Sequence, residues 1–259
     1  MSTYDWTAQE PQLFGYQSKD LKRIHNQTLL WGADFGTGDL PAHLLADGEG
    51  KVDGVLYFER LKEINYPLKA IVSDGNRSLL RAAELVYGKP IIWQQCTRHF
   101  AESLRRLARE EEPKHEMQTN ALCKQLCFVV QQKSHKAFHA ALVIFVDQKH
   151  RYRTDKQLEM IKHFWKNLGS LVQHLEHPEL ALPMTNNMIE NYNRQLKLRL
   201  NSLGQFHSHQ NATNYLKLWN LYRRFTPFTD FKKPNKQRNG KSPLQLAGVN
   251  THKIDYLNL

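Results

Sequence analysis

The stretch LKAIVSDGNRSLLRAAELVYGKPIIWQQC, residues 68–96, decides the fold that we expect for this chain of 259 residues. It begins with an apolar run that ends in an Asp-Gly pair, the pattern of a buried strand followed by a turn. Residues 76–88 then have the spacing of a helix and close on a glycine, which commonly ends helices. A second apolar run, residues 90–96, predicts another strand. The stretch therefore predicts a strand, a helix and a strand in succession.

Three further strands and a helix are expected before this stretch. Aromatic and β-branched residues favour strands at residues 2–9, 28–35 and 40–46, the last two paired as a hairpin. Residues 10–27 are polar and are expected to form a loop, and residues 52–64 have the pattern of an amphipathic helix. The resulting order is three strands, helix, strand, helix, strand. It is the layout of an RNase H-like core, so we expect an α/β fold with a mixed five-stranded sheet and flanking helices.

Beyond residue 97 the patterns change from strand to helix. Residues 1–97 are expected to form the first part of the core. Residues 98–182 are predicted to form a mostly helical insertion into it. Residues 183–228 return to the core with two helices. Residues 229–259 form a basic tail that contains Pro and Gly and is expected to be mobile.

The chain is strongly basic, with 36 Lys and Arg residues against 25 Asp and Glu residues and a formal net charge of +11. This excess favours a polyanionic partner, nucleic acid before a membrane surface. No apolar run approaches the roughly 20 residues that a membrane-spanning helix needs, and the first residues lack the pattern of a signal peptide. Three cysteines without a disulfide pattern indicate a reducing, intracellular protein.

Acidic residues stand where an RNase H-like core would gather them. In this layout the acids on the first and fourth strands lie side by side, and a third acid comes from a later helix. Three carboxylates so placed can hold two divalent cations, because Mg²⁺ prefers oxygen ligands. Two such ions stabilise the attacking and the leaving oxygen when a phosphodiester is displaced.

Asp74 ends the fourth expected strand, and Glu190 opens a helical pattern within PMTNNMIENYNRQLKLRL, residues 183–200. Each also has a simpler interpretation, since Asp-Gly is common in turns and the helix dipole favours an acid in the first turn. For the first acid, Asp34 ends an apolar run. The count of three strands before the first helix makes that run the second strand, however. We therefore prefer Asp5, with Asp34 as the alternative.

Three motifs occur in a fixed order: AIVSDGNRSLLRAA, QQCTRHFAESLRRL and TNNMIENYNRQLKLRL, with YRRF behind the last and the helical insertion before it. In this order they resemble the Mutator-type DDE transposases and their bacterial insertion-sequence relatives over nearly the whole chain. The resemblance implies DNA cleavage and strand transfer during transposition, at a site that holds two Mg²⁺ or Mn²⁺ ions. It implies DNA (element ends and target) as the partner and a homo-oligomer on DNA. The catalytic and metal-binding residues that it implies are Asp5, Asp74 and Glu190.

Cys96 and His99 match the Cys-x-x-His motif of that family, whose histidine is expected near the metals or a phosphate. Both are therefore counted among the expected catalytic residues. The alternative is a pair at a helix start that only packs. A zinc site would join this pair to Cys123 and Cys127. Those two fall within an apolar helix, where free Cys usually behaves as a small hydrophobic residue.

The helix of Glu190 is expected to direct that acid to the metals and its basic side chains to DNA. Its buried stripe is predicted from apolar residues at helical spacing, namely Ile189, Tyr192, Leu196, Leu200 and Leu203. Basic residues that share the helix, together with two on the following helix, are expected to contact phosphates. The expected DNA-binding residues are Arg194, Lys197, Arg199, Arg223 and Arg224. The aromatic residues between the last basic positions favour a place in the core.

Members of the family normally carry a DNA-binding region ahead of the catalytic core, and only four residues precede Asp5. We therefore expect an N-terminally truncated copy. Two alternatives stay open: a catalytically inactive or domesticated DNA-binding remnant, and an RNase H-like nuclease that cuts without joining. The expected location is the cytoplasm or nucleoid of a prokaryote or the nucleus of a eukaryote, without membrane association.

Overall fold

The structure is a computed structural model. It describes residues 4–6, 14–17, 24–46, 48, 50–203, 206, 208–232 and 235–251. The chain divides into two compact units, of which the first comprises residues 1–71, 76–91 and 187–259 and the second comprises residues 72–75 and 92–186. Strand β5 (Ala70–Ser73) is divided between the two units.

The described residues are mostly helical, and this overturns the expected RNase H-like α/β core with a mixed five-stranded sheet. Six strands, most of them short, follow the order β2-β3-β1-β5-β6 with β4 paired to β3. Apolar and β-branched runs predict where strands occur, but they carry no information on strand length or pairing. The expected loop at residues 10–27 contains β2 (Phe14–Gln17) and the start of β3 (Ile24–Asp34), because these two segments pair with each other.

The strands of the first unit are arranged around β3. Strands β1 (Tyr4–Trp6), β2 and β4 (His43–Ala46) each pair with it in antiparallel orientation. The register sets Asp5 opposite Ala33, and β3 with β4 forms the expected hairpin. The strand order places β1 next to β5.

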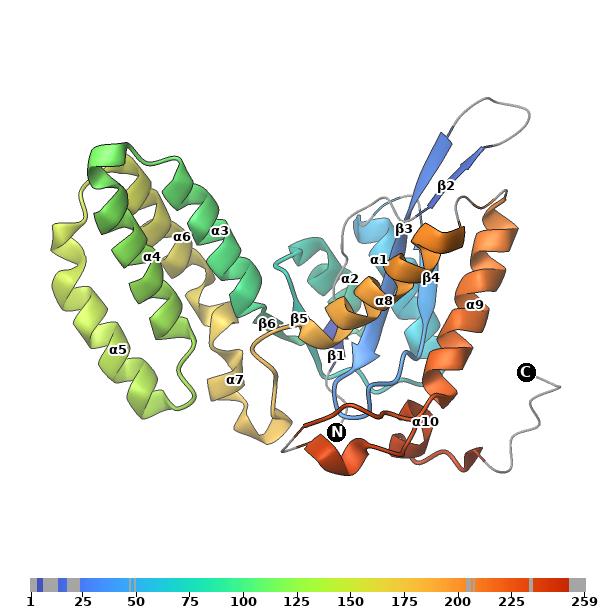
Figure 1. The fold of residues 1–259 in the computed structure, drawn as a ribbon. Helices are drawn as coiled ribbons and strands as arrows, with labels where there is room; N and C mark the ends of the chain where they lie inside the picture. The colour runs from blue at the N-terminus through green and yellow to red at the C-terminus, as the bar shows by residue number, and fades with distance from the viewer. Residues whose placement is uncertain are drawn as a thin grey trace. The chain divides into compact units, whose positions relative to one another are not determined.

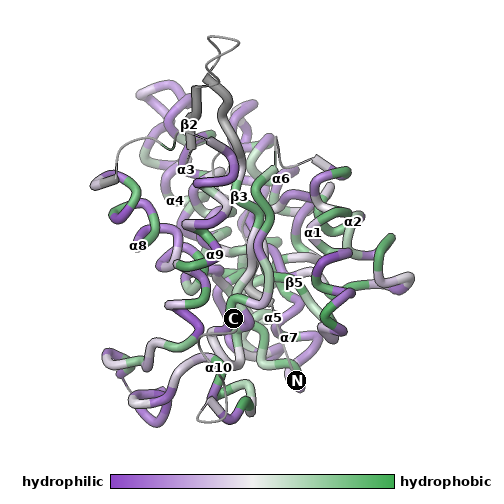
Figure 2. The backbone as a smooth tube through the Cα atoms, turned by 90° about the vertical axis from the view of Figure 1, so that its right-hand side faces the viewer, coloured by the Kyte–Doolittle hydropathy of each residue, from purple (hydrophilic) through white to green (hydrophobic). Residues whose placement is uncertain are grey.

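The long helices of the first unit are α1 (Lys51–Glu63), α2 (Arg77–Tyr87), α8 (Asn187–Leu203) and α9 (His209–Phe225). Helix α2 ends at Gly88 as its sequence predicts, with a φ of 64° there. At its start the Asn76 side chain accepts a hydrogen bond of 3.0 Å from Ser78 N, a cap that was not predicted. Helices α1 and α2 pack closely at Gly54, where a Cβ would lie 2.9 Å from Ala82 Cβ. Figure 2 shows hydrophobic and hydrophilic residues alternating along both helices, as expected for helices with one buried side.

The core of the first unit joins β3 to α8 and α9. Between ring centroids, Trp31 of β3 lies 5.0 Å from Trp219 of α9 and 6.5 Å from Tyr192 of α8. Trp31 Nε1 also donates a hydrogen bond of 2.7 Å to Asn193 Oδ1, and α8 crosses β3 in Figure 1. The predicted buried stripe of α8 is confirmed at Ile189, Tyr192, Leu196 and Leu200, whereas Leu203 lies outside the described side chains.

The second unit consists of β6 (Ile92–Gln95) and a helical bundle with its own apolar core. Its helices are α3 (Thr97–Arg109), α4 (Glu116–Val130), α5 (His135–Gln148), α6 (Asp155–Leu171) and α7 (Gln173–Glu176), with short 3₁₀ turns at Pro113–His115, Lys149–Arg151 and Pro178–Leu180. The helical insertion predicted for residues 98–182 falls within this unit. Helices α3 to α6 run alongside one another in Figure 1. No described helix, the apolar α5 included, is long and apolar enough to cross a membrane.

The basic tail, expected to be mobile, forms folded elements where the structure describes it. A 3₁₀ turn (Asn235–Arg238) and helix α10 (Pro243–Leu246) follow the main helices. Gly240 N donates a hydrogen bond of 2.8 Å to Phe228 O, and Leu244 of α10 is buried. The sequence of the tail is basic, but its apolar positions fold back on the first unit.

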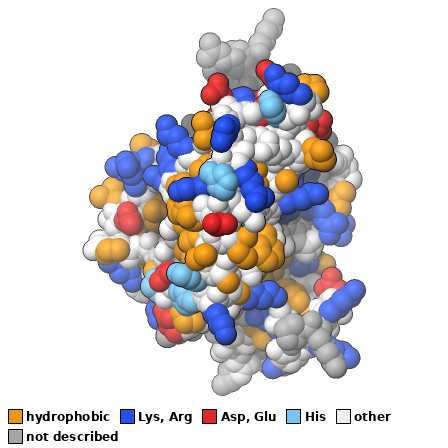
Figure 3. All heavy atoms as spheres, turned by 90° about the vertical axis from the view of Figure 1, so that its left-hand side faces the viewer, with side chains coloured by type: hydrophobic (Ala, Val, Ile, Leu, Met, Phe, Trp, Pro, Cys, Tyr) orange, Lys and Arg blue, Asp and Glu red, His pale blue; other side chains and the backbone are white. Residues whose placement is uncertain are grey.

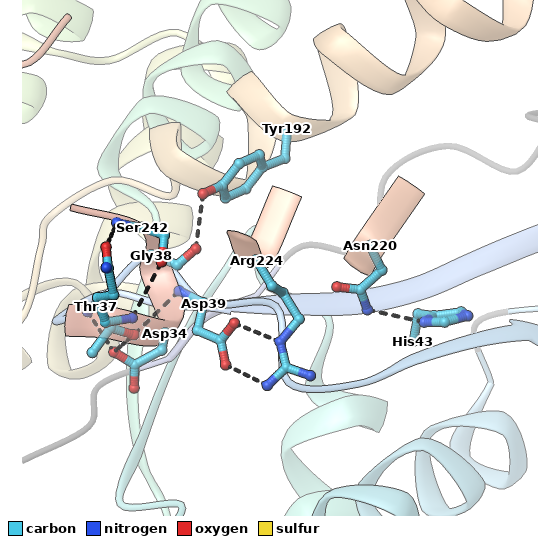
Figure 4. Close-up of polar contacts among 10 residues, drawn as sticks. Asp34, Thr37, Gly38, Asp39, His43, Tyr192, Asn220, Arg224 and Ser242 are labelled. Carbon is cyan, nitrogen blue, oxygen red and sulfur yellow. Dashed lines mark hydrogen bonds and ion pairs between the residues drawn. The ribbon is translucent and has the colours of Figure 1, made fainter. Parts of the chain in front are cut away.

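A nearly buried ion pair fastens α9 to the turn between β3 and β4 (Figure 4). Arg224 Nε and Nη2 donate hydrogen bonds of 2.7 and 2.9 Å to the two carboxylate oxygens of Asp39. The Asp39 side chain is 9% exposed, so its charge depends on the guanidinium for solvation.

We expect Arg224→Gln to lower the free energy of unfolding by about 3 kcal/mol, because it leaves the Asp39 carboxylate without its counter-charge. As the matched control, Arg199→Gln removes the same charge from an exposed position of α8 and should change stability by less than about 0.5 kcal/mol. Urea unfolding followed by tryptophan fluorescence measures both. Equal stabilities of the two variants would contradict the role assigned to the pair.

Candidate functional site

Backbone contacts join the ends of β5 and β6 in the second unit. Cys96 N donates a hydrogen bond of 2.7 Å to Ser73 O. The turn after β5 contains Gly75 with a φ of 117°, and a Cβ there would lie 3.0 Å from Gln95 Nε2. Because glycine alone adopts this backbone readily, the turn depends on it. The turn sets Asp74 just after the end of β5, where it lines one hollow together with residues of α3.

A hollow of about 590 Å³ lies between Asp74 and one side of α3. The residues of α3 that line it are His99, Glu102, Ser103, Arg105, Arg106 and Arg109. Glu102 is paired with Arg98 at 3.7 Å, so its charge is partly offset. Three arginines therefore give this side of the hollow an excess of positive charge, and Asp74 also lines the hollow.

The middle of α3 is fixed by a stacked histidine from α6. The His163 ring stacks on Phe100 with centroids 5.4 Å apart and an interplanar angle of 10°, and its Nε2 lies 2.9 Å from Ser103 Oγ. Burial lowers the pKa of His163, and the charges of Lys166 and Arg106 lower it further. The Ser103 hydroxyl donates to Phe100 O at 2.7 Å, so a neutral His163 ring donates its Nε2–H to Ser103 Oγ and holds α3 against α6.

Cys96 is fully buried at the N-cap position of α3. Its Sγ–H donates a hydrogen bond of 3.2 Å to Asn186 Oδ1, and Sγ lies within 4.8 Å of a ring nitrogen of His99. Next to it, Thr97 N and Oγ1 both donate to Met184 O, at 2.9 and 3.1 Å. These contacts favour a positioning role for Cys96, while a catalytic role for this residue or for His99 stays a prediction.

The zinc interpretation gains no support from the described residues. No group of ligand atoms that could hold a metal there contains Cys123 or Cys127. Cys123 belongs to the apolar core of the helical bundle, with Cys127 packed against it. The hydrogen bond between the two thiols lowers the pKa of Cys123 to about 7. Burial opposes this shift, and the charge of Arg105 adds to it. The same hydrogen bond raises the pKa of Cys127.

Asp34, the alternative first acid, is engaged in bracing the turn after β3. Thr37 donates to Asp34 Oδ1 through its backbone N at 2.8 Å and its Oγ1 at 3.0 Å, and the Tyr66 hydroxyl donates to Oδ2. Asp34 is 3% exposed. Figure 4 shows it inside this turn, with Tyr192 donating to Gly38 O at 2.8 Å. A carboxylate that already accepts hydrogen bonds at both oxygens is poorly suited to a catalytic metal. The preference for Asp5 over Asp34 stays a prediction.

The expected acids fall into different units. Asp5 is on β1 and Glu190 is in the first turn of α8, both in the first unit, whereas Asp74 belongs to the second. Their joint action therefore stays a prediction.

The expected DNA-binding residues differ in how free they are. Arg194, Lys197 and Arg199 are exposed on α8, and Arg194 donates a hydrogen bond of 3.0 Å to Asn191 Oδ1. Arg223 lies over the Tyr192 ring, 5.1 Å from its centroid, and Arg224 is held by Asp39. The three residues of α8 remain candidates for contacts with DNA, while the two of α9 take part in packing.

Sequence reasoning missed the arginines of the hollow. A signal was present, because His99, Glu102, Arg106 and Arg109 recur at spacings of three, four and three residues and so share one side of a helix. A basic helix face is common on protein surfaces, however. Only the presence of Asp74 in the same hollow distinguishes this face of α3 from an ordinary solvated one.

A scan against protein-family models finds no match, and no curated protein matches the chain.

The main effect of replacing Asp34 should be a loss of folding stability. We expect Asp34→Asn to lower the free energy of unfolding by about 2 kcal/mol, because a neutral amide cannot accept all three hydrogen bonds with the strength of a carboxylate. The exposed Asp230→Asn should leave stability unchanged. Thermal melting compares the two variants. A fully stable Asp34→Asn chain would contradict the bracing role and return Asp34 to the candidate catalytic acids.

A partly buried histidine at the start of β4 should make stability depend on pH. Burial, together with the charges of Arg60 and Lys217, lowers the pKa of His43 from its ordinary 6.5 to about 4. Its Nδ1 lies 3.1 Å from Asn220 Nδ2 (Figure 4), so the neutral ring accepts a hydrogen bond there. In the unfolded chain His43 therefore binds a proton near pH 6.5, whereas in the folded chain it binds one only near pH 4.

We expect the contribution of His43 to stability to be complete above pH 6.5 and to be lost as the pH falls toward 4. Between pH 7 and pH 5 the loss should be roughly 2 kcal/mol. His43→Gln, which keeps an acceptor but cannot titrate, should remove this part of the pH dependence. Urea midpoints of both proteins at the two pH values measure the difference, and parallel pH profiles would show that His43 is not the group responsible.

Proposed function

We propose that this chain cuts and joins DNA in the manner of a DDE transposase, with divalent cations held by carboxylates. The observation that carries the proposal is a hollow that is lined both by Asp74 and by three arginines of α3. A carboxylate can hold a hard cation, and guanidinium groups bind phosphate oxygens through paired hydrogen bonds. The two kinds of group in one hollow suit a phosphodiester substrate.

Within the hollow, Asp74 offers the kind of oxygen ligand that a divalent cation prefers. Asp74 supplies a carboxylate on a turn whose backbone is fixed by Gly75 and by the contact between Ser73 and Cys96. A bound Mg²⁺ or Mn²⁺ would polarise a phosphate oxygen and make water or a hydroxyl a better nucleophile. Asp5 and Glu190 are the further carboxylates that we assign to this role, on the basis of the sequence resemblance.

The other residues of the hollow have roles that follow from their chemistry. Arg105, Arg106 and Arg109 would hold the phosphate group and offset its charge as it changes during displacement. His99 can accept or donate a proton at an oxygen of the reacting group. Cys96 would act at a distance, by fixing the start of α3 and with it the ring of His99.

The overall charge of +11 supports a nucleic acid as the substrate. On α8, the exposed Arg194, Lys197 and Arg199 would bind the phosphate backbone without reading its sequence. Such contacts position DNA and make binding depend on salt, so they account for affinity and leave specificity for particular DNA ends to other residues.

The proposal predicts that Asp74→Asn lowers metal-dependent DNA cleavage and strand transfer by roughly a hundredfold or more, because a carboxylate that stabilises the transition state is lost. The experiment uses the full chain, a pool of DNA duplexes with exposed 3′-hydroxyl ends, a supercoiled plasmid as target, and Mg²⁺ or Mn²⁺. Plasmid nicking reports cleavage and insertion of labelled duplex reports joining. Glu190→Gln should behave as Asp74→Asn does, and Asp230→Asn should retain activity.

The outcomes separate the competing functions. Nicking without insertion would favour a nuclease, and DNA binding without either reaction would favour a non-catalytic remnant. Activity that persists in Asp74→Asn would contradict the catalytic role of the hollow.

A further inference from the structure

Helix α5 is apolar on its outward side as well as on the side that faces the bundle. Ala141 and Phe145 are buried against the core, yet Val143 and Ile144 are each 54% exposed and Val146 is 39% exposed. A helix at the surface of a bundle normally turns polar residues outward. Figure 3 faces the side that lies at the left of Figure 1, where α5 is, and shows hydrophobic side chains gathered there among basic and acidic ones.

The outward positions of α5 are symmetric about the midpoint of the helix. Six exposed positions recur at spacings of three, one, three, one and three residues along one face, and the exposed His135 and Val146 lie beside this face. The two outermost of these positions carry opposite charges. The four between them hold a histidine, an alanine, a valine and an isoleucine. The three mirrored pairs are Lys136 with Asp147, His139 with Ile144 and Ala140 with Val143.

The two charges stand at the unfavourable ends of their own helix. Lys136 lies in the first turn, where the helix dipole favours an acid, and Asp147 lies in the last turn, where it favours a base. Neither side chain forms an ion pair among the described residues. An antiparallel neighbour with the same sequence would correct both, because it brings an acid to the lysine and a base to the aspartate.

We propose that α5 is the contact between two copies of this chain, paired antiparallel across a two-fold axis at the midpoint of the helix. Lys136 of each copy then lies opposite Asp147 of the other, and the pairing occurs twice by symmetry. Ala140, Val143 and Ile144 lie between the two ion pairs, where the small alanine lets the helices approach. The pairing needs no DNA and holds whether or not the chain is an enzyme.

The size of the contact sets its strength. Helix α5 has 14 residues and is therefore about 21 Å long. One helix pair of this length falls below the roughly 1,200 Å² of total buried surface that stable complexes usually bury. We therefore expect a dimer in equilibrium with the monomer, whose population rises with protein concentration.

Sedimentation equilibrium of the full chain without DNA tests the pairing through charge exchange. Lys136→Glu alone sets two acids opposite each other and Asp147→Lys alone sets two lysines opposite each other, so each should raise the dissociation constant roughly tenfold. The double variant restores both pairs with reversed sign and should dimerise as the natural chain does. Val143→Asp should abolish the dimer, with circular dichroism to confirm that the bundle is folded.

Two controls keep the test specific. Lys89→Glu makes the same charge change on the first unit and should leave dimerisation unchanged, and so should Asp74→Asn. A natural chain that stays monomeric at all concentrations would overturn the proposal. So would a double variant that remains as weak as the single ones, since only the antiparallel register predicts the rescue.

Discussion

One backbone hydrogen bond, from Cys96 N to Ser73 O at 2.7 Å, determines where the chemistry proposed for this chain can occur. It joins the ends of β5 and β6, and so it places the turn of Asp74 and Gly75 next to the start of α3. The buried thiol of Cys96 also donates a hydrogen bond to Asn186 Oδ1 and so helps to fix the start of α3. Without this junction, Asp74 would be an ordinary turn residue and the arginines of α3 an ordinary basic helix surface.

The first unit shows how long-range contacts change the meaning of local sequence. Asp39 and Arg224 are 185 residues apart in the sequence and form a bidentate ion pair. Arg224, which the sequence suggested for DNA binding, is therefore part of the packing. Asp34 likewise follows an apolar strand as a catalytic acid would, but Thr37 and Tyr66 occupy both of its oxygens. Each residue was plausible by itself, and its partner decided its role.

Local signals predicted the elements better than the fold. The end of α2 at Gly88, the buried stripe of α8 and the hairpin of β3 with β4 follow from signals that act within a few positions along the chain. The five-stranded RNase H-like sheet failed because it required strand lengths and pairings, and β2 pairs through polar segments that resemble a loop. The arginines that line the hollow with Asp74 were not predicted, because their position beside it depends on the junction of β5 with β6.

The chemistry proposed for this chain requires that Asp74 holds a divalent cation in the hollow beside a phosphate group. Crystals of the full chain soaked in Mn²⁺ test it directly through the anomalous scattering of the metal, with Asp74→Asn crystals treated in the same way. We expect a manganese peak in contact with the Asp74 carboxylate that is absent from the variant. Manganese bound elsewhere in the protein, with none at Asp74, would contradict it.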